Sequence, residues 1–100
     1  MSGASANASR GEAWLLNRVL RPSFDALVAA EEELGPLFAL VERAASGQLK
    51  LSEMVTLFWH CLKERDDLSR EGFAELIAEA GLAAVTPALK ALLGQILAGR

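Results

Sequence analysis

Apolar side chains recur every three or four positions along most of the chain after residue 22, as expected for one buried face of an α-helix. Residues that favour helix starts and stops divide this stretch into segments with brief connections. The expected helices run from Ser23 to Gly35, from Pro36 to about Ala45, from Ser52 onward, from Ser69 to Gly81 and from Thr86 to near Gly99. We therefore predict an all-α fold, a compact bundle of about five short helices.

The chain before the first helix shows two weaker patterns. Residues 1–10 are mostly Ser, Ala, Gly and Asn without periodicity, so we expect a disordered tail ahead of a single helical domain at 11–100. Residues 14–20 are apolar but short, with Asn17 and Arg18 in the middle. This second pattern fits either a small β-hairpin or an irregular segment packed on the helices.

The expected third helix is apolar around more than half of its circumference when its residues are projected at 100° steps. Its apolar positions are Met54, Val55, Leu57, Phe58, Trp59, Cys61 and Leu62. A helix of this kind belongs in the middle of a domain, so we predict that the others pack around it. His60 falls on the polar strip of the same helix.

Charge and length exclude several classes of function. The formal net charge is −3 and the 10 Lys and Arg residues are scattered, so no basic stripe is available for nucleic acid. The apolar runs are far shorter than the roughly 20 residues that span a bilayer, and the start of the chain lacks the apolar core of a secretory signal. We therefore expect a cytoplasmic protein that binds neither nucleic acid nor membrane. The single cysteine agrees with a reducing compartment.

The residues that could carry chemistry lack partners for it. His60 and Cys61 are adjacent, and neighbours on a helix point about 100° apart, which argues against a catalytic pair. Glu71, Glu75 and Glu79 lack the Glu-x-x-His arrangement of a carboxylate metal site, so a solvated acidic face is expected. The sequence contains no Gly-rich phosphate loop and no nucleophile elbow. We predict no enzymatic activity, no cofactor and no metal.

Non-covalent binding is the remaining class of function, and three apolar residues are candidate partner contacts. Trp59 lies at the border of the apolar arc of its helix, and large aromatic residues are enriched at interfaces. Leu92 and Leu93 belong to a leucine-rich stripe on the last helix, which a partner could cover if the other helices leave it open.

Glu31 is a fourth candidate, because it places a carboxylate among the apolar residues of the first helix. A charge in such a place needs a partner or nearby water to avoid a desolvation penalty. An ion pair with Arg21 or Arg43 is the simpler interpretation. The alternative is that Glu31 orients a basic residue of a bound partner.

The stretch RPSFDALVAAEEELG at residues 21–35 resembles the opening of a family of small tail-assembly chaperones of phage-like gene transfer agents, sometimes described as tail tube components. The resemblance rests on the order of its elements over about residues 11–98. The matching residues are Phe24, Ala26, Leu27, Glu31, Leu34 and Gly35, then Leu40, Arg43, Gly47, Leu49 and Leu51, and later Ser69, Leu76, Ile77 and Gly81. The segment before the first helix departs from the family pattern, since Asn17-Arg18 stands where an Asp-Gly type turn is usual.

The resemblance implies a small adaptor that helps to build a siphophage-like tail by holding the long tape-measure protein while tail tube subunits assemble around it. Its partner would then be the tape-measure or tail tube protein. One alternative is a helix-turn-helix regulator, although its recognition helix should carry Arg, Lys, Asn or Gln and the third helix here is largely apolar. Another is a small enzyme or ligand carrier that uses His60, for which the sequence offers no base, nucleophile or metal partner.

Overall fold

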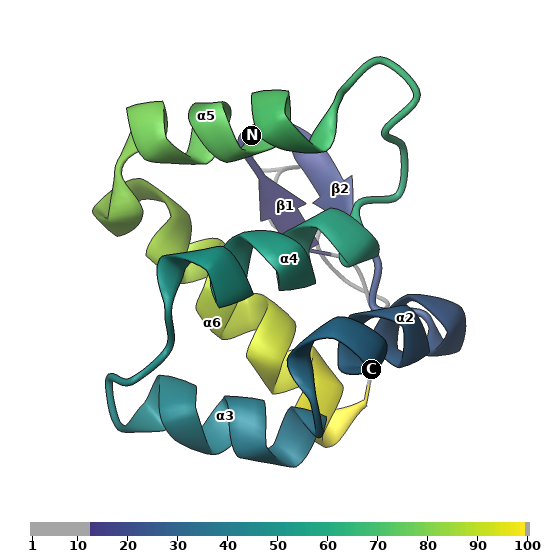
Figure 1. Ribbon diagram of the computed structural model, residues 1–100, viewed down its shortest axis with the longest axis vertical. Helices are drawn as coiled ribbons and strands as arrows, with labels where there is room; N and C mark the ends of the chain where they lie inside the picture. Colours follow the sequence, from purple (N-terminus) through teal and green to yellow (C-terminus); the bar gives the residue numbers. More distant parts are fainter. Residues whose placement is uncertain (1–12, 100) are drawn as a thin grey trace, which may run out of the picture.

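A short hairpin precedes five helices in the computed structural model, which describes residues 13–99 (Figure 1). The strands are β1 (Ala13–Leu15) and β2 (Arg18–Leu20), and the helices are α2 (Phe24–Leu34), α3 (Leu37–Ala45), α4 (Leu51–Cys61), α5 (Arg70–Ala80) and α6 (Leu82–Ala98). The five predicted helices are confirmed, and of the two alternatives for residues 14–20 the hairpin is the correct one. The fold is therefore mostly helical rather than all-α. The predicted tail at 1–10 lies outside the described residues.

Two residues with left-handed backbone close the hairpin. Leu16 has a φ of 50° and Asn17 a φ of 68°, and a two-residue type I′ turn needs positive φ at both positions. β1 pairs with β2 in antiparallel orientation. On the other edge of β2, the carbonyl of Val19 accepts a hydrogen bond from the N–H of Lys63 at 2.9 Å. The hairpin is thereby anchored to the segment that follows α4.

Serine side chains cap two helices at the predicted positions. Ser23 Oγ accepts from the Ala26 N–H at 3.2 Å at the start of α2, and Ser69 Oγ accepts from the Gly72 N–H at 2.9 Å at the start of α5. Each cap satisfies a backbone donor that has no partner inside its helix. Both of these helix starts are thus confirmed.

The start of α4 differs from the prediction by one residue. The helix begins at Leu51 rather than Ser52. The carboxylate of Glu53 accepts the Lys50 N–H at 2.9 Å, so the first turn closes one residue earlier.

The start of α6 differs more, because the helix begins four residues before the predicted Thr86 and holds Pro87 in its interior. The Thr86 hydroxyl, which we expected to cap the helix, donates instead to the carbonyl of Leu82 at 2.7 Å. Burial explains the early start, since three residues at i, i+3 and i+7 form one stripe toward the core. The stripe comprises Val85, Ala88 and Leu92. Packing of this stripe outweighs the one hydrogen bond that Pro87 cannot donate.

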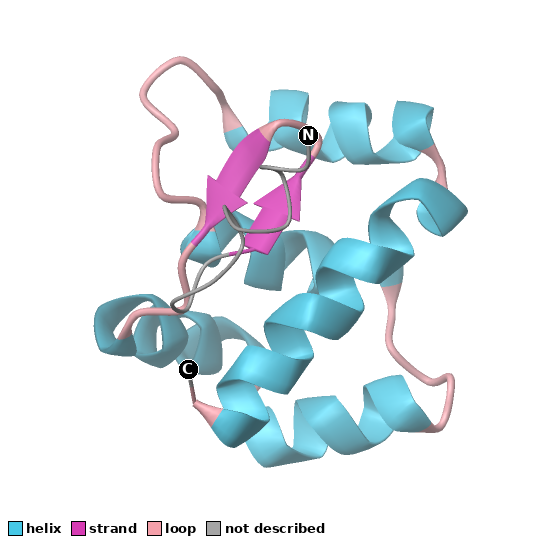
Figure 2. Ribbon diagram, turned by 180° about the vertical axis from the view of Figure 1, so that it is seen from behind, coloured by secondary structure: helices cyan, strands magenta, loops and turns pink. Residues whose placement is uncertain are grey.

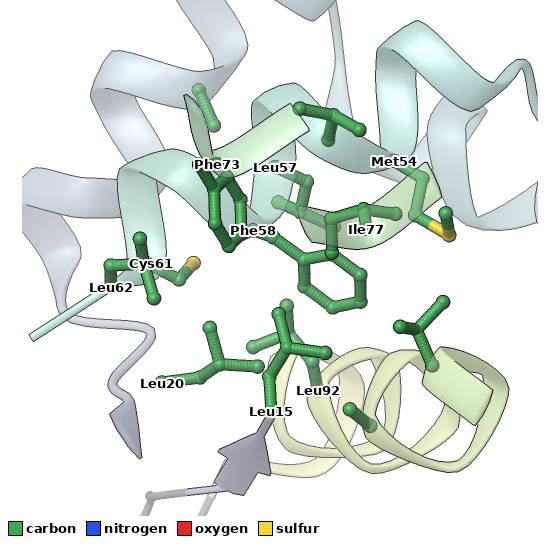
Figure 3. Packing of buried hydrophobic residues seen from close by; sticks show 14 of the residues in the cluster. Leu15, Leu20, Met54, Leu57, Phe58, Cys61, Leu62, Phe73, Ile77 and Leu92 are labelled. Atoms are coloured by element: carbon green, nitrogen blue, oxygen red, sulfur yellow. The ribbon is translucent and has the colours of Figure 1, made fainter. Parts of the chain in front are cut away.

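α4 lies at the centre of the core, as predicted, and five of its side chains are buried. They are Met54, Val55, Leu57, Phe58 and Cys61. The fully buried ring of Phe58 points into a region that it shares with Leu15 of β1 and Leu92 of α6 (Figure 3). One apolar cluster thereby joins the hairpin to all five helices.

A sharp bend at Gly81 separates α5 from α6. The residue has a φ of 90°, which glycine adopts without the steric penalty of a side chain. The bend directs α6 back across the molecule, where it contacts β1 (Figure 2). Among residues 13–99, no single helix is long and apolar enough to cross a membrane, and α5 and α6 meet that criterion only as a pair bent by 114°.

Candidate partner-binding groove

Helices α2 and α3 and the C-terminal end of α6 come together at one end of the molecule (Figures 1 and 2). An open apolar groove lies between them. Its volume is about 250 Å³. The lining consists of Leu27 and Glu31 from α2, Leu37, Phe38 and Val41 from α3, and Ile96 and Leu97 from α6. Six of these seven side chains are apolar, so the groove is suited to an apolar ligand surface.

Two aromatic side chains are almost fully exposed, one in the lining of the groove and one on the same face of α2. Phe24 is 80% exposed and Phe38 is 79% exposed. Phe24 precedes Leu27 and Val28 by one helical turn, so it extends the apolar strip of α2 beyond the groove. Single exposed apolar residues are common, but a contiguous patch with aromatic residues marks an interaction surface.

Glu31 is the one charged residue in the lining of the groove, and its carboxylate contacts backbone. Its Oε2 accepts the N–H of Leu37 at 3.0 Å, which satisfies a free donor at the start of α3. The expected ion pair with Arg43 is wrong, because Arg43 Nη2 lies 2.6 Å from Glu53 Oε2 and joins α3 to α4. Pairing with Arg21 and the role toward a partner stay predictions.

The predicted contact surface on the last helix is only partly available. Leu92 is fully buried, so a direct contact with a partner is incompatible with this fold. Its side chain belongs to the core because it continues the buried stripe of α6. Leu93 is half-buried and packs against the core, and its role toward a partner stays a prediction.

Trp59 is half-buried and lies away from the lining of the groove. Its ring centroid is 5.9 Å from that of Phe73, and the guanidinium of Arg65 lies 5.1 Å above the indole. Arg65 also donates to the Trp59 carbonyl at 2.9 Å. One face of the indole is thus covered within the chain by a cation–π contact, and a partner role for Trp59 stays a prediction.

A charged cluster that the sequence did not reveal joins α2, α4 and α5. Glu33 Oε1 accepts from Arg70 Nη2 at 2.7 Å, and Glu33 Oε2 lies 2.5 Å from His60 Nε2. Arg70 Nη2 also contacts the hydroxyl of Thr56 at 3.2 Å. Hydrogen bonds from Arg70 and from His60 lower the pKa of Glu33 to about 2. His60 is therefore part of an interhelical contact.

The low pKa of Glu33 predicts a loss of stability in acid. Because the carboxylate has a lower pKa in the folded state than its ordinary 4.5, it stabilises the fold above about pH 4.5 and ceases to do so as the pH falls toward 2. Glu33→Gln should reduce the free energy of unfolding at neutral pH by about 1 kcal/mol or less, since solvent screens this half-exposed group. Urea unfolding of both proteins from neutral pH to about pH 2 measures the difference, which should disappear in acid. A constant difference across this range would contradict the assignment.

The other residues considered for chemistry lie in surroundings that do not favour it. Cys61 is buried, and this burial raises the pKa of its thiol to about 12, so the reactive thiolate is scarce at neutral pH. Glu71, Glu75 and Glu79 are all exposed on α5. Within the described part of the chain, no group of three or more His, Cys, Asp or Glu residues could hold a metal ion.

Comparison with known families covers most of the chain. The sequence model of the family described as "Phage tail tube protein, GTA-gp10" matches residues 16–99. The match includes β2 and all five helices, and hence every residue that lines the groove. No curated protein and no solved structure matches the chain. The match confirms the resemblance to a tail component of phages and gene transfer agents, and the chain belongs to the family described as phage tail tube protein, GTA-gp10.

Proposed function

We propose that this protein is a small assembly adaptor of a phage-like tail, a chaperone that holds the tape-measure protein or the tail tube protein until the tail is built. It acts in the cytoplasm, by non-covalent binding and without catalysis. The observation that carries the proposal is the match to the phage tail tube protein family over residues 16–99.

The surface of the molecule supports a binding role. An adaptor needs an apolar surface that stays open on the free protein and is covered in the complex. The groove between α2, α3 and α6 has this character, with the exposed ring of Phe38 in its lining. The net charge of −3 helps to keep such a protein soluble while that surface is uncovered.

Co-purification tests the proposal directly. The tagged full chain is co-expressed, in separate cultures, with the tape-measure protein and with the tail tube protein of the same tail gene cluster. We expect one of the two to be retained on the affinity resin and to be more soluble than when it is expressed alone. Retention of neither would refute the proposal, and retention of nucleic acid instead would favour the helix-turn-helix alternative.

Substitution of His60 separates a structural role from a chemical one. His60→Ala removes one contact of Glu33, while Arg70 keeps the other. We therefore expect unchanged retention of the tail partner and a loss of stability of about 1 kcal/mol or less. Co-purification and urea unfolding measure the two quantities. Loss of function in a folded His60→Ala protein would revive the enzyme or ligand-carrier alternative.

A further inference from the structure

The apolar lining and open form of the groove indicate what kind of segment could bind in it. Its apolar side chains come from three helices, and the groove is open to solvent. Phe38 is exposed in its lining, and Phe24 is exposed one helical turn before Leu27. An amphipathic helix buries one apolar stripe and keeps the rest of its surface in water, so it fits a groove of this form. The remaining question is which charges the rest of its surface should carry.

The rim of the groove is acidic. Projection at 100° steps places Asp25 and Glu32 of α2 and Glu42 of α3 beside the outer edge of the apolar strip, next to exposed side chains such as Phe38. Glu31 adds a carboxylate in the lining itself.

The helical segments that line the groove contain few basic residues. Along residues 24–45 and 91–99 the only Lys or Arg is Arg43. Its guanidinium lies 2.6 Å from Glu53 on α4 and is therefore engaged away from the rim. The acidic rim thus faces any occupant without a nearby counter-charge from these segments.

From this arrangement we propose that the groove binds a basic amphipathic helix, one whose apolar stripe is flanked by Lys or Arg. The apolar stripe of the partner packs between α2, α3 and the end of α6, with Phe24 and Phe38 as aromatic anchors. The flanking Lys or Arg residues meet the carboxylates of the rim, and one of them reaches Glu31. That this helix belongs to the tape-measure or tail tube protein rests on the proposed function. The preference of the groove for a basic helix does not depend on that function.

Two other occupants fit less well. A second copy of the chain would bring two acidic rims together, which is unfavourable. Residues 1–12 contain a single large apolar side chain, Met1, and so offer no apolar stripe of their own. The surface therefore favours a different, basic chain.

Two designed peptides of about 18 residues test the inference without knowledge of the natural partner. Both carry the same apolar stripe of Leu at helical spacing, and one has Lys where the other has Glu beside this stripe. We expect the Lys peptide to bind about tenfold more tightly or better, with a difference that shrinks in high salt. Methyl NMR spectra should show shifts at Leu27, Val41 and Ile96.

Variants of the full chain locate the site. Phe38→Ala should weaken binding of the Lys peptide by about tenfold or more, as expected for an aromatic anchor. Glu31→Gln removes the charge but keeps an oxygen that can accept from Leu37, so it should weaken the Lys peptide and spare the Glu peptide. The matched control is Leu82→Ala, an exposed leucine on α6 that lies about 22 Å from Leu97 along the helix and should bind like the unaltered protein.

Several results would overturn the inference. They are equal affinity for the two peptides, methyl shifts outside the groove, or normal binding by Phe38→Ala. A dimer in solution whose interface contains the groove would assign the surface to a second copy instead. If the tape-measure or tail tube protein co-purified equally with Phe38→Ala, the groove assignment would fail while the adaptor proposal stood. If neither protein co-purified and the Lys peptide still bound in the groove, the adaptor proposal would fail while the groove assignment stood.

Discussion

Phe58→Ala should destabilise the protein by about 3–5 kcal/mol, enough to unfold a large fraction of a domain of this size. The reason is its position: Phe58 is fully buried at the middle of α4, in the core region that it shares with Leu15 and Leu92. Removal of the ring takes away apolar contacts with the hairpin and with α6 together. A cavity left between three elements cannot close by the movement of a single side chain.

Phe24→Ala is the matched control, because the same atoms are removed from a ring that is 80% exposed. We expect a change within about 0.5 kcal/mol for this variant. Urea unfolding followed by circular dichroism compares the two, and a shift of the midpoint without a change of slope identifies a pure stability effect. Similar losses for Phe24→Ala and Phe58→Ala would show that α4 is not the centre of the core.

The helix boundaries that depend on local chemistry could be predicted from the sequence. Ser23, Gly35, Ser69 and Gly81 act through their own side chain or backbone, and the structure places them at the predicted helix ends. The start of α6 depends instead on burial of Val85, which becomes visible only when the helix is packed. The pair Thr86-Pro87 favours a helix start at Thr86 by local rules, although Pro87 lies within the helix. Local rules fail here because tertiary packing outweighs one missing hydrogen bond.

The hairpin illustrates a second limit of the sequence. Its turn uses Leu16 and Asn17, and a leucine at positive φ is an unusual choice for a type I′ turn. The conformation is supported from outside, because β2 is held on its far edge by Lys63 and the side chain of Leu15 is buried. No pattern within residues 14–20 encodes either of these contacts, so the sequence left hairpin and irregular segment equally open.

Only part of the candidate site could be predicted from the sequence, because the site also depends on contacts between distant segments. The groove is lined by seven residues that lie between Leu27 and Leu97 in the sequence. They belong to three helices, and the sequence does not show that these three helices meet. Glu31 was found because a carboxylate within an apolar strip is a signal in a single helix. Phe38 was missed, because an apolar residue beside buried ones looks like core until its exposure is known. The Glu33 and Arg70 pair, 37 positions apart, was beyond any local pattern.

Alanine substitutions at Leu92 and at Leu97 should have opposite effects on stability and on binding, because the two leucines lie on one helix in opposite environments. Leu92 is fully buried and Leu97 is 58% exposed at the groove. Leu92→Ala should destabilise the fold by about 2–5 kcal/mol, while Leu97→Ala should change stability by no more than about 0.5 kcal/mol. Binding of the Lys peptide should be weakened by Leu97→Ala and not by Leu92→Ala, because only Leu97 can touch an occupant of the groove.

The measurement must separate lost binding from lost folding. Urea unfolding gives the stability of each variant, and peptide binding is then measured at a temperature where circular dichroism shows Leu92→Ala to be folded. Under that condition we expect Leu92→Ala to bind normally and Leu97→Ala to bind more weakly. If Leu92→Ala kept its unfolding midpoint and lost the peptide, Leu92 would face the partner and α6 would be rotated relative to the core described above. Normal stability together with normal binding would contradict the burial of Leu92, because removal of a side chain from a close-packed interior leaves a cavity and lowers stability.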